Sequence, residues 1–202
     1  MNFSCKTKIY LADINRVDES RLSELSRERA EKAVRYKMAD DRKRSISVGL
    51  LLSRFLPDTR IHTDEFGKPR AESGVCFNLS HSGDYAVLAV ADNEIGVDIE
   101  RARDITALKM GKIVFCENEM ELLEKSGGNT RLFFDLWTKK EALLKCMGKG
   151  FHRNAKSVDV SGDYYDEDKT RYYFKLYRFD DYTLAACSTI DNFPDNLEFV
   201  EV

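Results

Sequence analysis

Apolar residues recur every three or four positions between residues 133 and 150, which is the pattern of a helix with one buried side. The positions that form this side are Phe133, Leu136, Trp137, Leu143, Leu144 and Met147. Glu141 and Lys145 lie four residues apart on an adjacent polar flank, so their side chains are within reach of each other. Gly148 and Gly150 are predicted to end the helix, because glycine often stands just past a helix C-terminus.

Lys140 breaks this pattern, because at about 100° per residue it projects from the middle of the apolar side. One interpretation is that its methylenes lie along the core while its ammonium reaches water. The other is that the helix points a cation and a carboxylate at a charged ligand, since local rules are most often broken at functional sites. The helix pattern alone does not separate the two.

Residues 95–100 alternate strictly between apolar and other side chains. The apolar residues share one face of the predicted strand, so the carboxylates of Asp98 and Glu100 project from the other face, and Gly96 leaves space beside Asp98. An acidic face in water would explain this alternation. Two carboxylates at i and i+2 can also share a hard cation if a third ligand arrives from elsewhere, and Glu141 is a candidate.

The N-terminal region is predicted to form a strand over residues 8–13 and a helix over residues 18–36. Arg29, Lys32 and Arg35 lie three apart on one outer stripe of this helix, an arrangement typical of a solvated surface.

A second helix is predicted to begin at a cap formed by Asp40 or Asp41 and to end before Pro57. Its predicted buried side consists of Ile46, Val48, Leu51, Leu52 and Phe55. Arg44 and Ser45 are placed in its first turns, where free backbone N–H groups and the helix dipole favour an anion.

The middle of the chain predicts three strands close together in sequence. Residues 66–69 form a turn by composition, and strands follow over residues 75–79, 85–91 and 95–100. Residues 80–84 are a turn dense in hydrogen-bonding groups. Such short spacing favours an antiparallel meander.

The C-terminal half follows a polar connection at residues 101–105. Its predicted elements are a short helix over 117–124, a break at 127–128, a cap at Asn129 or Thr130, strands over 158–160, 172–177 and 182–187, a turn at Asp180 and Asp181, and a solvated acidic loop over 163–168.

Two stretches of the chain, residues 84–89 and 181–186, resemble each other, and in each half a helix precedes a hairpin. We therefore predict an α/β (α+β) fold of two pseudo-symmetric lobes, residues 1–102 and 103–202, each a small antiparallel sheet packed with a long helix. The functional site would lie in the cleft between the lobes, where pockets prefer to form.

Composition excludes several classes of protein. The 202 residues, with 43% hydrophobic and 33% charged side chains, are typical of a soluble globular protein. A net charge of −3 provides no general field for nucleic acid, so any anion site must be local. Five scattered cysteines without a CxxC pair favour a reducing compartment. Because no signal peptide or membrane span is predicted, we expect a cytoplasmic protein that makes no membrane contact.

These signals converge on a magnesium and diphosphate site, because carboxylates that can share a hard cation occur with lysine, arginine and histidine side chains that can meet phosphate. Residues 77–82 (FNLSHS), 95–100 (IGVDIE) and 137–145 (WTKKEALLK) closely resemble the signature motifs of 4′-phosphopantetheinyl transferases. The three motifs occur in order at suitable separations, and residues 66–69 (FGKP) and 29–45 also fit, so the resemblance covers most of the chain.

The resemblance implies that coenzyme A binds in the cleft with a magnesium ion on its diphosphate. The serine hydroxyl of an acyl or peptidyl carrier protein would attack the β-phosphorus, and adenosine 3′,5′-bisphosphate would be released. By motif position, the implied metal ligands are Asp98, Glu100 and Glu141. Glu141 would also help to remove the serine proton, directly or through a water, and Lys145 would stabilise charge on the diphosphate.

By the same resemblance, His81 and Arg44 would meet the 3′-phosphate of coenzyme A. The other implied coenzyme A contacts are Arg29, Lys32, Ser45, Lys68, Pro69, Ser80, Asp98, Lys140 and Lys145. A rival assignment makes His81 the general base, although its serine-rich surroundings suit an anion contact better.

The chain contains both halves of the site, so the resemblance is to the longer, two-lobed (surfactin-synthetase-activating) type, and implies a monomer that works as a pseudo-dimer. Two departures are Arg29, where a lysine is expected, and Thr138, where the family often has another small residue. Two alternative functions are a magnesium-dependent hydrolase of a nucleotide diphosphate and a non-catalytic relative that binds carrier proteins. The intact acidic motif residues argue against the second alternative.

Overall fold

The computed structural model describes residues 7–148 and 154–202. The strands are β1 (Lys8–Asp13), β2 (Ile61–Thr63), β3 (Pro69–Ala71), β4 (Cys76–Ser82), β5 (Tyr85–Ala91), β6 (Ile95–Arg101), β7 (Tyr164–Glu167), β8 (Thr170–Phe179), β9 (Tyr182–Ser188) and β10 (Glu198–Val200). The α-helices are α1 (Arg27–Val34), α2 (Ala39–Phe55), α3 (Ala107–Val114), α4 (Glu117–Lys125) and α5 (Thr130–Met147). Short 3₁₀ helices are η1 (Ile14–Arg16), η2 (Glu19–Glu24) and η4 (Ala155–Ser157).

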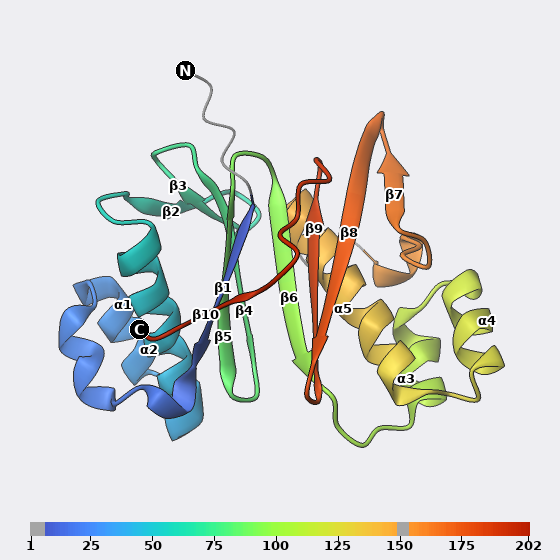
Figure 1. Ribbon diagram of the computed structural model, residues 1–202, viewed down its shortest axis with the longest axis horizontal. Helices are drawn as coiled ribbons and strands as arrows, with labels where there is room; N and C mark the ends of the chain where they lie inside the picture. Colours follow the sequence, from blue (N-terminus) through green and yellow to red (C-terminus); the bar gives the residue numbers. More distant parts are fainter. Residues whose placement is uncertain (1–6, 149–153) are drawn as a thin grey trace.

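Two four-stranded sheets pack against each other, with a long helix on the outer face of each (Figure 1). The first sheet has the order β10-β1-β5-β4 and carries α2, and the second has the order β6-β9-β8-β7 and carries α5. All neighbouring strands are antiparallel except β1 and β10, which are parallel. This arrangement confirms the predicted α/β (α+β) fold with two lobes.

Alternation along the strands builds the core between the sheets. On β5, Val87 and Ala89 face the second sheet, while Ala86 and Leu88 face α2. Because successive side chains of a strand point to opposite faces, each buried strand serves two apolar layers. The apolar side of β6, which the sequence predicts, lies in the layer between the sheets, so its two carboxylates face the α5 side.

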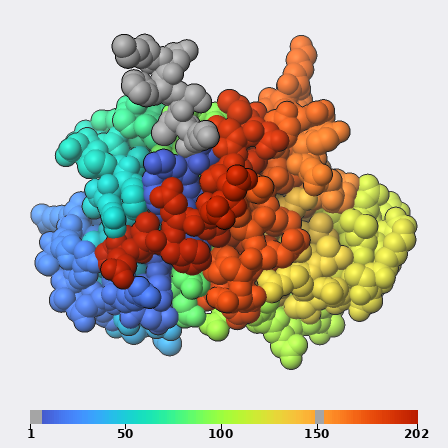
Figure 2. Space-filling model, in the orientation of Figure 1, coloured from blue at the N-terminus to red at the C-terminus, as the bar shows by residue number. Residues whose placement is uncertain are grey.

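The predicted division of the chain at residue 102 does not match the sheets. β6, which was assigned to the N-terminal lobe, pairs with β9 of the second sheet. Conversely, β10 returns across the molecule from the second lobe to pair with β1 (Figure 2). The predicted meander is therefore wrong beyond β4 and β5, since β6 belongs to the other sheet.

The secondary structure corrects further predictions. The expected helix over residues 18–36 divides into η2 and α1, because Leu25 has extended backbone and Ser26 is not helical and caps α1. α2 is capped at Met38 without a side-chain hydrogen bond, not by Asp40 or Asp41. Residues 158–160 are not a strand, and the expected acidic loop over 163–168 contains β7. The sequence pattern did not predict β2, β3, β10 or α3.

Several boundaries agree with the predictions. β1 and β5 have the predicted bounds, and α4 extends one residue beyond its predicted end. Asn129 caps α5 by accepting a hydrogen bond from the Leu132 backbone, and Gly148 ends α5 with a left-handed conformation. Gly150, the second predicted stop, lies outside the described residues. No helix among the described residues is both long and apolar enough to cross a membrane.

The two similar stretches meet where the lobes join. Asp84 and Asp181 both form ion pairs with Arg101, at 3.1 and 2.7 Å. The rings of Tyr85 and Tyr182 pack edge to face with their centroids 5.0 Å apart. Equivalent residues of the two halves therefore contact each other, which supports the internal repeat.

Candidate active site

The close contact of α5 with β6 positions the candidate catalytic residues. A Cβ atom on Gly96 would lie 2.0 Å from the carbonyl oxygen of Ala142 and 2.4 Å from the backbone nitrogen of Cys146. Because such distances are far shorter than any van der Waals contact, a glycine at this position allows the helix to lie directly on the strand. The polar flank of α5, with Glu141 and Lys145, is thereby brought beside Asp98.

A cleft with a volume of about 380 Å³ opens beside these residues. Its walls come from the turn between β2 and β3, from β4 and from α5. The lining residues are Phe66, Gly67, Lys68, Pro69, Asn78, Leu79, Glu141, Leu144, Lys145 and Gly148. The cleft has the size of a small-ligand pocket, and it combines apolar walls with a few charged groups.

Asp98 contacts Lys145, which lines the cleft, and is almost fully buried. Its Oδ1 accepts hydrogen bonds from the Lys145 ammonium at 2.6 Å and from the Ser80 hydroxyl at 2.9 Å. Its Oδ2 is buried and has no hydrogen-bond partner among residues 7–148 and 154–202. A buried carboxylate oxygen without a partner is costly, so this atom is a candidate ligand for a bound cation.

The carboxylates of Glu100 and Glu141 add negative charge near Asp98. Partial burial raises the pKa of each carboxyl group, and the negative charge of Asp98 raises both further. Glu141 makes no hydrogen bond or ion pair with the described part of the chain, whereas Glu100 accepts bonds from Trp137 and Ser82. Carboxyl groups that raise one another's pKa in a partly buried site repel each other when ionised, and a bound cation relieves this repulsion.

These residues fit a hard divalent cation such as Mg²⁺, which prefers carboxylate oxygens. The observation that supports the fit is the buried Oδ2 of Asp98, which lacks a partner in the described residues. The oxygens of these three carboxylates do not all lie within 4.8 Å of one another. Among the described residues, only the group Cys116, Glu119 and Asp159 meets that distance.

The expected phosphate contacts lie around the start of α1, around α2 and at the end of β4. The half-buried guanidinium of Arg29 has two nitrogens without a partner among the described residues, and burial lowers its pKa. Arg44 donates to the Gly83 carbonyl at 2.8 Å and to Asp41 at 2.7 Å. Desolvation lowers the pKa of His81, and the charges of Arg44 and Lys145 lower it further. Cationic groups that depress the pKa of a histidine create a site that favours an anion.

Other predicted contacts are placed less directly. Lys32 is exposed on α1, and Ser45 is half-buried on α2. Arg44 and Ser45 lie in the second turn of α2, which begins at Ala39, so both residues lie beyond the four free N–H groups that were expected to favour an anion. Pro69 lines the cleft.

Lys68 lines the cleft with a buried side chain whose ammonium is already bonded. It donates to Glu94 at 2.7 Å and to the Cys146 carbonyl at 2.9 Å, near the C-terminus of α5. This lysine therefore joins the β2–β3 turn to the end of the helix.

Lys140 does not lie at the cleft, and its predicted contact with coenzyme A is wrong. Its side chain is fully buried, and its ammonium bonds to Glu119 at 2.7 Å and to the carbonyls of Ala155 and Val158 at 2.8 and 2.7 Å. The ammonium does not reach water either, so both interpretations of the sequence pattern are replaced by a buried ion pair. A buried charge of this kind is tolerated because it is paired and hydrogen-bonded.

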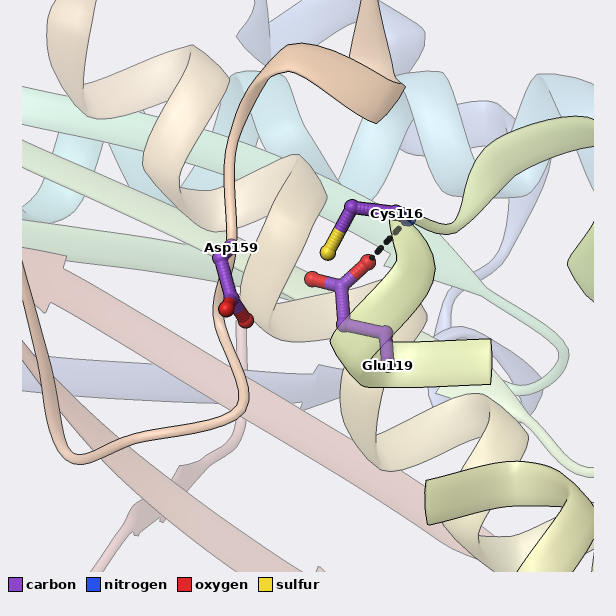
Figure 3. A group of neighbouring side chains, drawn as sticks. All are labelled: Cys116, Glu119 and Asp159. Atoms are coloured by element: carbon purple, nitrogen blue, oxygen red, sulfur yellow. Dashed lines mark hydrogen bonds between the residues drawn. The ribbon is translucent and has the colours of Figure 1, made fainter. Parts of the chain in front are cut away.

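The partner of this lysine belongs to a group of three possible metal ligands, Cys116, Glu119 and Asp159 (Figure 3). Glu119 accepts hydrogen bonds from the backbone of Cys116 at 2.9 Å and of Val160 at 2.8 Å, in addition to the Lys140 ammonium. Both oxygens of this carboxylate are therefore satisfied, and its charge is balanced by the lysine. The group is explained as a structural connection between α4, α5 and the residues that follow η4.

Two side chains that hold Glu100 were not predicted from the sequence. The Trp137 indole donates to Oε1 at 3.2 Å, and the Ser82 hydroxyl donates to Oε2 at 3.1 Å. Trp137 was assigned only to the buried side of α5, but it is half-buried. A signal for Ser82 exists in the sequence, because Ser80 and Ser82 have the same i, i+2 spacing as the two carboxylates of β6.

Known proteins with similar sequences are phosphopantetheinyl transferases. A profile described as the 4′-phosphopantetheinyl transferase superfamily matches residues 94–187, which include β6 and α5. The 4′-phosphopantetheinyl transferase Sfp of Bacillus subtilis (strain 168) is 30% identical over 203 residues, covering 91% of this chain and 90% of that protein.

Other relatives agree with this match. The 4′-phosphopantetheinyl transferase gsp of Aneurinibacillus migulanus is 32% identical over 159 residues, covering 74% of this chain and 65% of that protein. A further relative, the 4′-phosphopantetheinyl transferase ffp of Bacillus subtilis, is 29% identical over 89% of this chain and 88% of its own length. With this likeness over nearly its whole length, the chain belongs to the 4′-phosphopantetheinyl transferase family, a family of transferase enzymes.

Proposed function

We propose that the cleft beside α5 binds coenzyme A together with Mg²⁺, and that the protein transfers the phosphopantetheine arm to a serine of an acyl or peptidyl carrier protein. The observation that carries this proposal is the buried Oδ2 of Asp98, which lacks a partner in the described chain and lies beside Glu100, Glu141 and Lys145. Relatives named 4′-phosphopantetheinyl transferases support it.

In this proposal, Asp98, Glu100 and Glu141 hold the metal. When bound, the ion would neutralise the diphosphate and so favour attack at phosphorus. The carrier serine forms a bond to the β-phosphorus, and adenosine 3′,5′-bisphosphate leaves with the electron pair of the broken phosphorus–oxygen bond. Glu141 accepts the serine proton, directly or through a water, because its carboxylate lines the cleft and makes no hydrogen bond to the described residues.

Cationic side chains bind the remaining phosphate charge. Lys145 lies 2.6 Å from Asp98 with part of its side chain exposed, so its ammonium can share the carboxylate and the diphosphate. Arg29, Arg44 and His81 bind the 3′-phosphate. The two Arg29 nitrogens that lack a partner among the described residues support this assignment. Lys32, Ser45, Lys68, Pro69 and Ser80 complete the proposed coenzyme A site.

We also propose a cytoplasmic monomer. The described cysteines are free thiols, as expected in a reducing compartment. Both halves of the cleft come from one chain, since Asp98 and Glu141 lie on β6 and α5 of the same molecule. A second copy is therefore not needed to complete the site.

Mass spectrometry tests the proposal. Several apo carrier proteins are incubated with the protein, coenzyme A and Mg²⁺, and a parallel reaction contains a chelator in place of the metal. The expected result is a mass gain of one phosphopantetheinyl group on a carrier serine, with the chelated reaction inactive. Release of free phosphopantetheine without modified carrier would indicate a hydrolase. Tight binding of coenzyme A without transfer at any metal concentration would indicate a non-catalytic relative.

A further inference from the structure

The edges of β4 and β6 run beside each other but belong to different sheets. Side chains of β4 accept hydrogen bonds from every second backbone N–H of β6. Asn78 accepts from Val97 at 3.0 Å, Ser80 accepts from Ile99 at 3.4 Å, and Ser82 accepts from Arg101 at 3.1 Å. Both sets of residue numbers rise together, so this side-chain ladder has the direction of a parallel pair. It satisfies the edge of β6 and joins the two lobes.

The ladder also determines where the proton of each serine hydroxyl points. The Ser82 oxygen accepts from the Arg101 backbone, and a backbone N–H can only donate. The hydroxyl proton of Ser82 is therefore free to be donated, and it is directed at Oε2 of Glu100, 3.1 Å away. One small side chain thus closes the edge of a strand and holds the carboxylate that the same strand presents.

Ser80 behaves in the same way towards the neighbouring carboxylate. Its oxygen accepts from the backbone of Ile99 and from the Lys145 ammonium, so its proton is directed at Asp98. Ser80 belongs to the proposed coenzyme A site and shares Asp98 with the lysine. Ser82 is the simpler case, because its hydroxyl contacts Glu100 without that cation.

We infer that Ser82 is a positioning residue that holds Glu100 in the orientation needed to bind the divalent cation. This inference rests on the proposed metal site. The donated hydrogen bond fixes Oε2, while the Trp137 indole fixes Oε1 at 3.2 Å and the exposed Arg103 lies 3.8 Å from the carboxylate. Without the hydroxyl, one oxygen of Glu100 keeps only this distant, solvated cation, and the carboxylate can turn away from the site.

Binding of Mn²⁺ tests the inference independently of turnover. The free Mn²⁺ signal in electron paramagnetic resonance is followed during titration of the protein with coenzyme A present and carrier protein absent. Ser82→Ala is expected to weaken Mn²⁺ binding about 10-fold, the low end of the range for losing a hydrogen bond to a metal ligand. Ser82→Thr, which keeps the hydroxyl, should bind Mn²⁺ like the parent. Coenzyme A affinity measured without metal should be unchanged.

The matched control is Ser126→Ala. Ser126 also accepts from a backbone N–H, that of Asn129, and donates to an oxygen, the Leu123 carbonyl, but it lies at the end of α4. Its replacement should leave Mn²⁺ affinity at the parent value. In transfer assays, Ser82→Ala should raise the Mg²⁺ concentration needed for half-maximal rate and regain most of kcat at high metal concentration.

A lower melting temperature with parental Mn²⁺ affinity in Ser82→Ala would overturn the inference, because Ser82 would then only close the strand edge. Should this variant fail to fold, Ser82→Thr and Ser82→Val form a second pair of nearly equal shape that differ in the hydroxyl. Equal Mn²⁺ affinity in that pair would also overturn the inference. If the parent itself binds no Mn²⁺ with coenzyme A, the metal site of the proposed function fails, and the inference fails with it.

Discussion

Three carboxylates and one ammonium bring an excess of negative charge into a partly buried site. Asp98 forms an ion pair with Lys145, but the pKa values of Glu100 and Glu141 are still raised, first by burial and then by the charge of Asp98. The repulsion among these groups disfavours the metal-free folded protein when they are ionised, and a divalent cation would remove it. The residues proposed to bind the metal therefore cost stability until a cation is present.

Glu141→Gln tests this trade between stability and activity. The substitution removes one of the repelling charges, and Glu141 makes no hydrogen bond to the described residues that would be lost. We expect the metal-free melting temperature to stay the same or rise, while the rate of transfer falls by at least about 100-fold, the lower range for loss of a general base. Thermal melts and carrier mass spectrometry measure the two effects. A variant that transfers at the parental rate would contradict the role of Glu141.

His81 predicts how coenzyme A affinity depends on pH. Its pKa lies below the ordinary value because of desolvation and the nearby charges of Arg44 and Lys145, so near neutral pH the free protein holds it uncharged. A bound phosphate would raise this pKa, so binding should take up a proton and become tighter as pH falls from about 8 to about 6.5. Calorimetric titration with coenzyme A in buffers of different ionisation enthalpy measures the proton uptake.

His81→Gln is the control for this dependence, since glutamine keeps a donor but does not titrate. The variant should bind coenzyme A more weakly near pH 6.5 and lose most of the pH dependence. The phosphate itself also titrates near pH 6, so the difference between the parent and the variant is the relevant quantity. An identical pH dependence in both proteins would show that His81 does not contact the phosphate.

Two sides of α5 have different roles, one at the cleft and one in the core. Its polar flank reaches the cleft with Glu141 and Lys145, while its opposite side carries Lys140 into the core of the second lobe. Gly96 permits the first contact, because any larger side chain would collide with the helix backbone. The Lys140–Glu119 pair anchors the helix to α4 from the other side. The position of the active-site flank therefore depends on packing on both sides of α5.

Lys140→Met separates this anchoring role from the predicted cofactor contact. The substitution leaves the charge of Glu119 buried without its partner, which should lower the free energy of unfolding by about 3–5 kcal/mol. Adding Glu119→Leu should restore part of the loss, since an apolar pair can replace a buried ion pair. Urea unfolding measures both variants. Coenzyme A affinity of the folded double variant should match the parent, and a large loss of affinity would return Lys140 to the cofactor site.

In the molecule as a whole, the two lobes share one apolar core. The apolar layer between the sheets takes residues from β1 and β5 on one side and from β6 and β9 on the other. β10 crosses back to the first sheet, and the side-chain ladder from β4 closes the edge of β6. Neither lobe can therefore bury its apolar surface alone. The common core also holds the two walls of the cleft in place relative to each other.

The fragment 1–102 tests the predicted division of the chain. It contains β6 without β9 and β1 without β10, so two strands would lose main-chain partners and the central apolar layer would be exposed. We expect the fragment to lack a cooperative unfolding transition by circular dichroism. The full chain should unfold in one transition, seen alike by circular dichroism and by fluorescence of its single tryptophan, Trp137. A stably folded fragment would contradict a shared core.

Local patterns predicted elements more reliably than their pairing. The strict alternation of residues 95–100 and the spacing of α5 each follow from burial of one face, so their faces were correct. The pairing of β6 was wrong because closeness in sequence favours a meander, whereas its backbone pairs with β9, far along the chain. β7 was missed because its residues are acidic and aromatic at the edge of a sheet, where burial is too small to impose a pattern.

The chemical groups of this protein follow from its sequence alone: which carboxylates share a face of a strand, which cation lies one helical turn from Glu141, and which family those motifs resemble. Which of these charges contact each other depends on how the lobes pack. Lys140 and Lys145 are both lysines on one helix, yet one neutralises Glu119 in the core and the other contacts Asp98 at the cleft. Helical spacing sets the direction of a side chain, but the partner it reaches depends on residues distant in the sequence, and so does the role of Ser82.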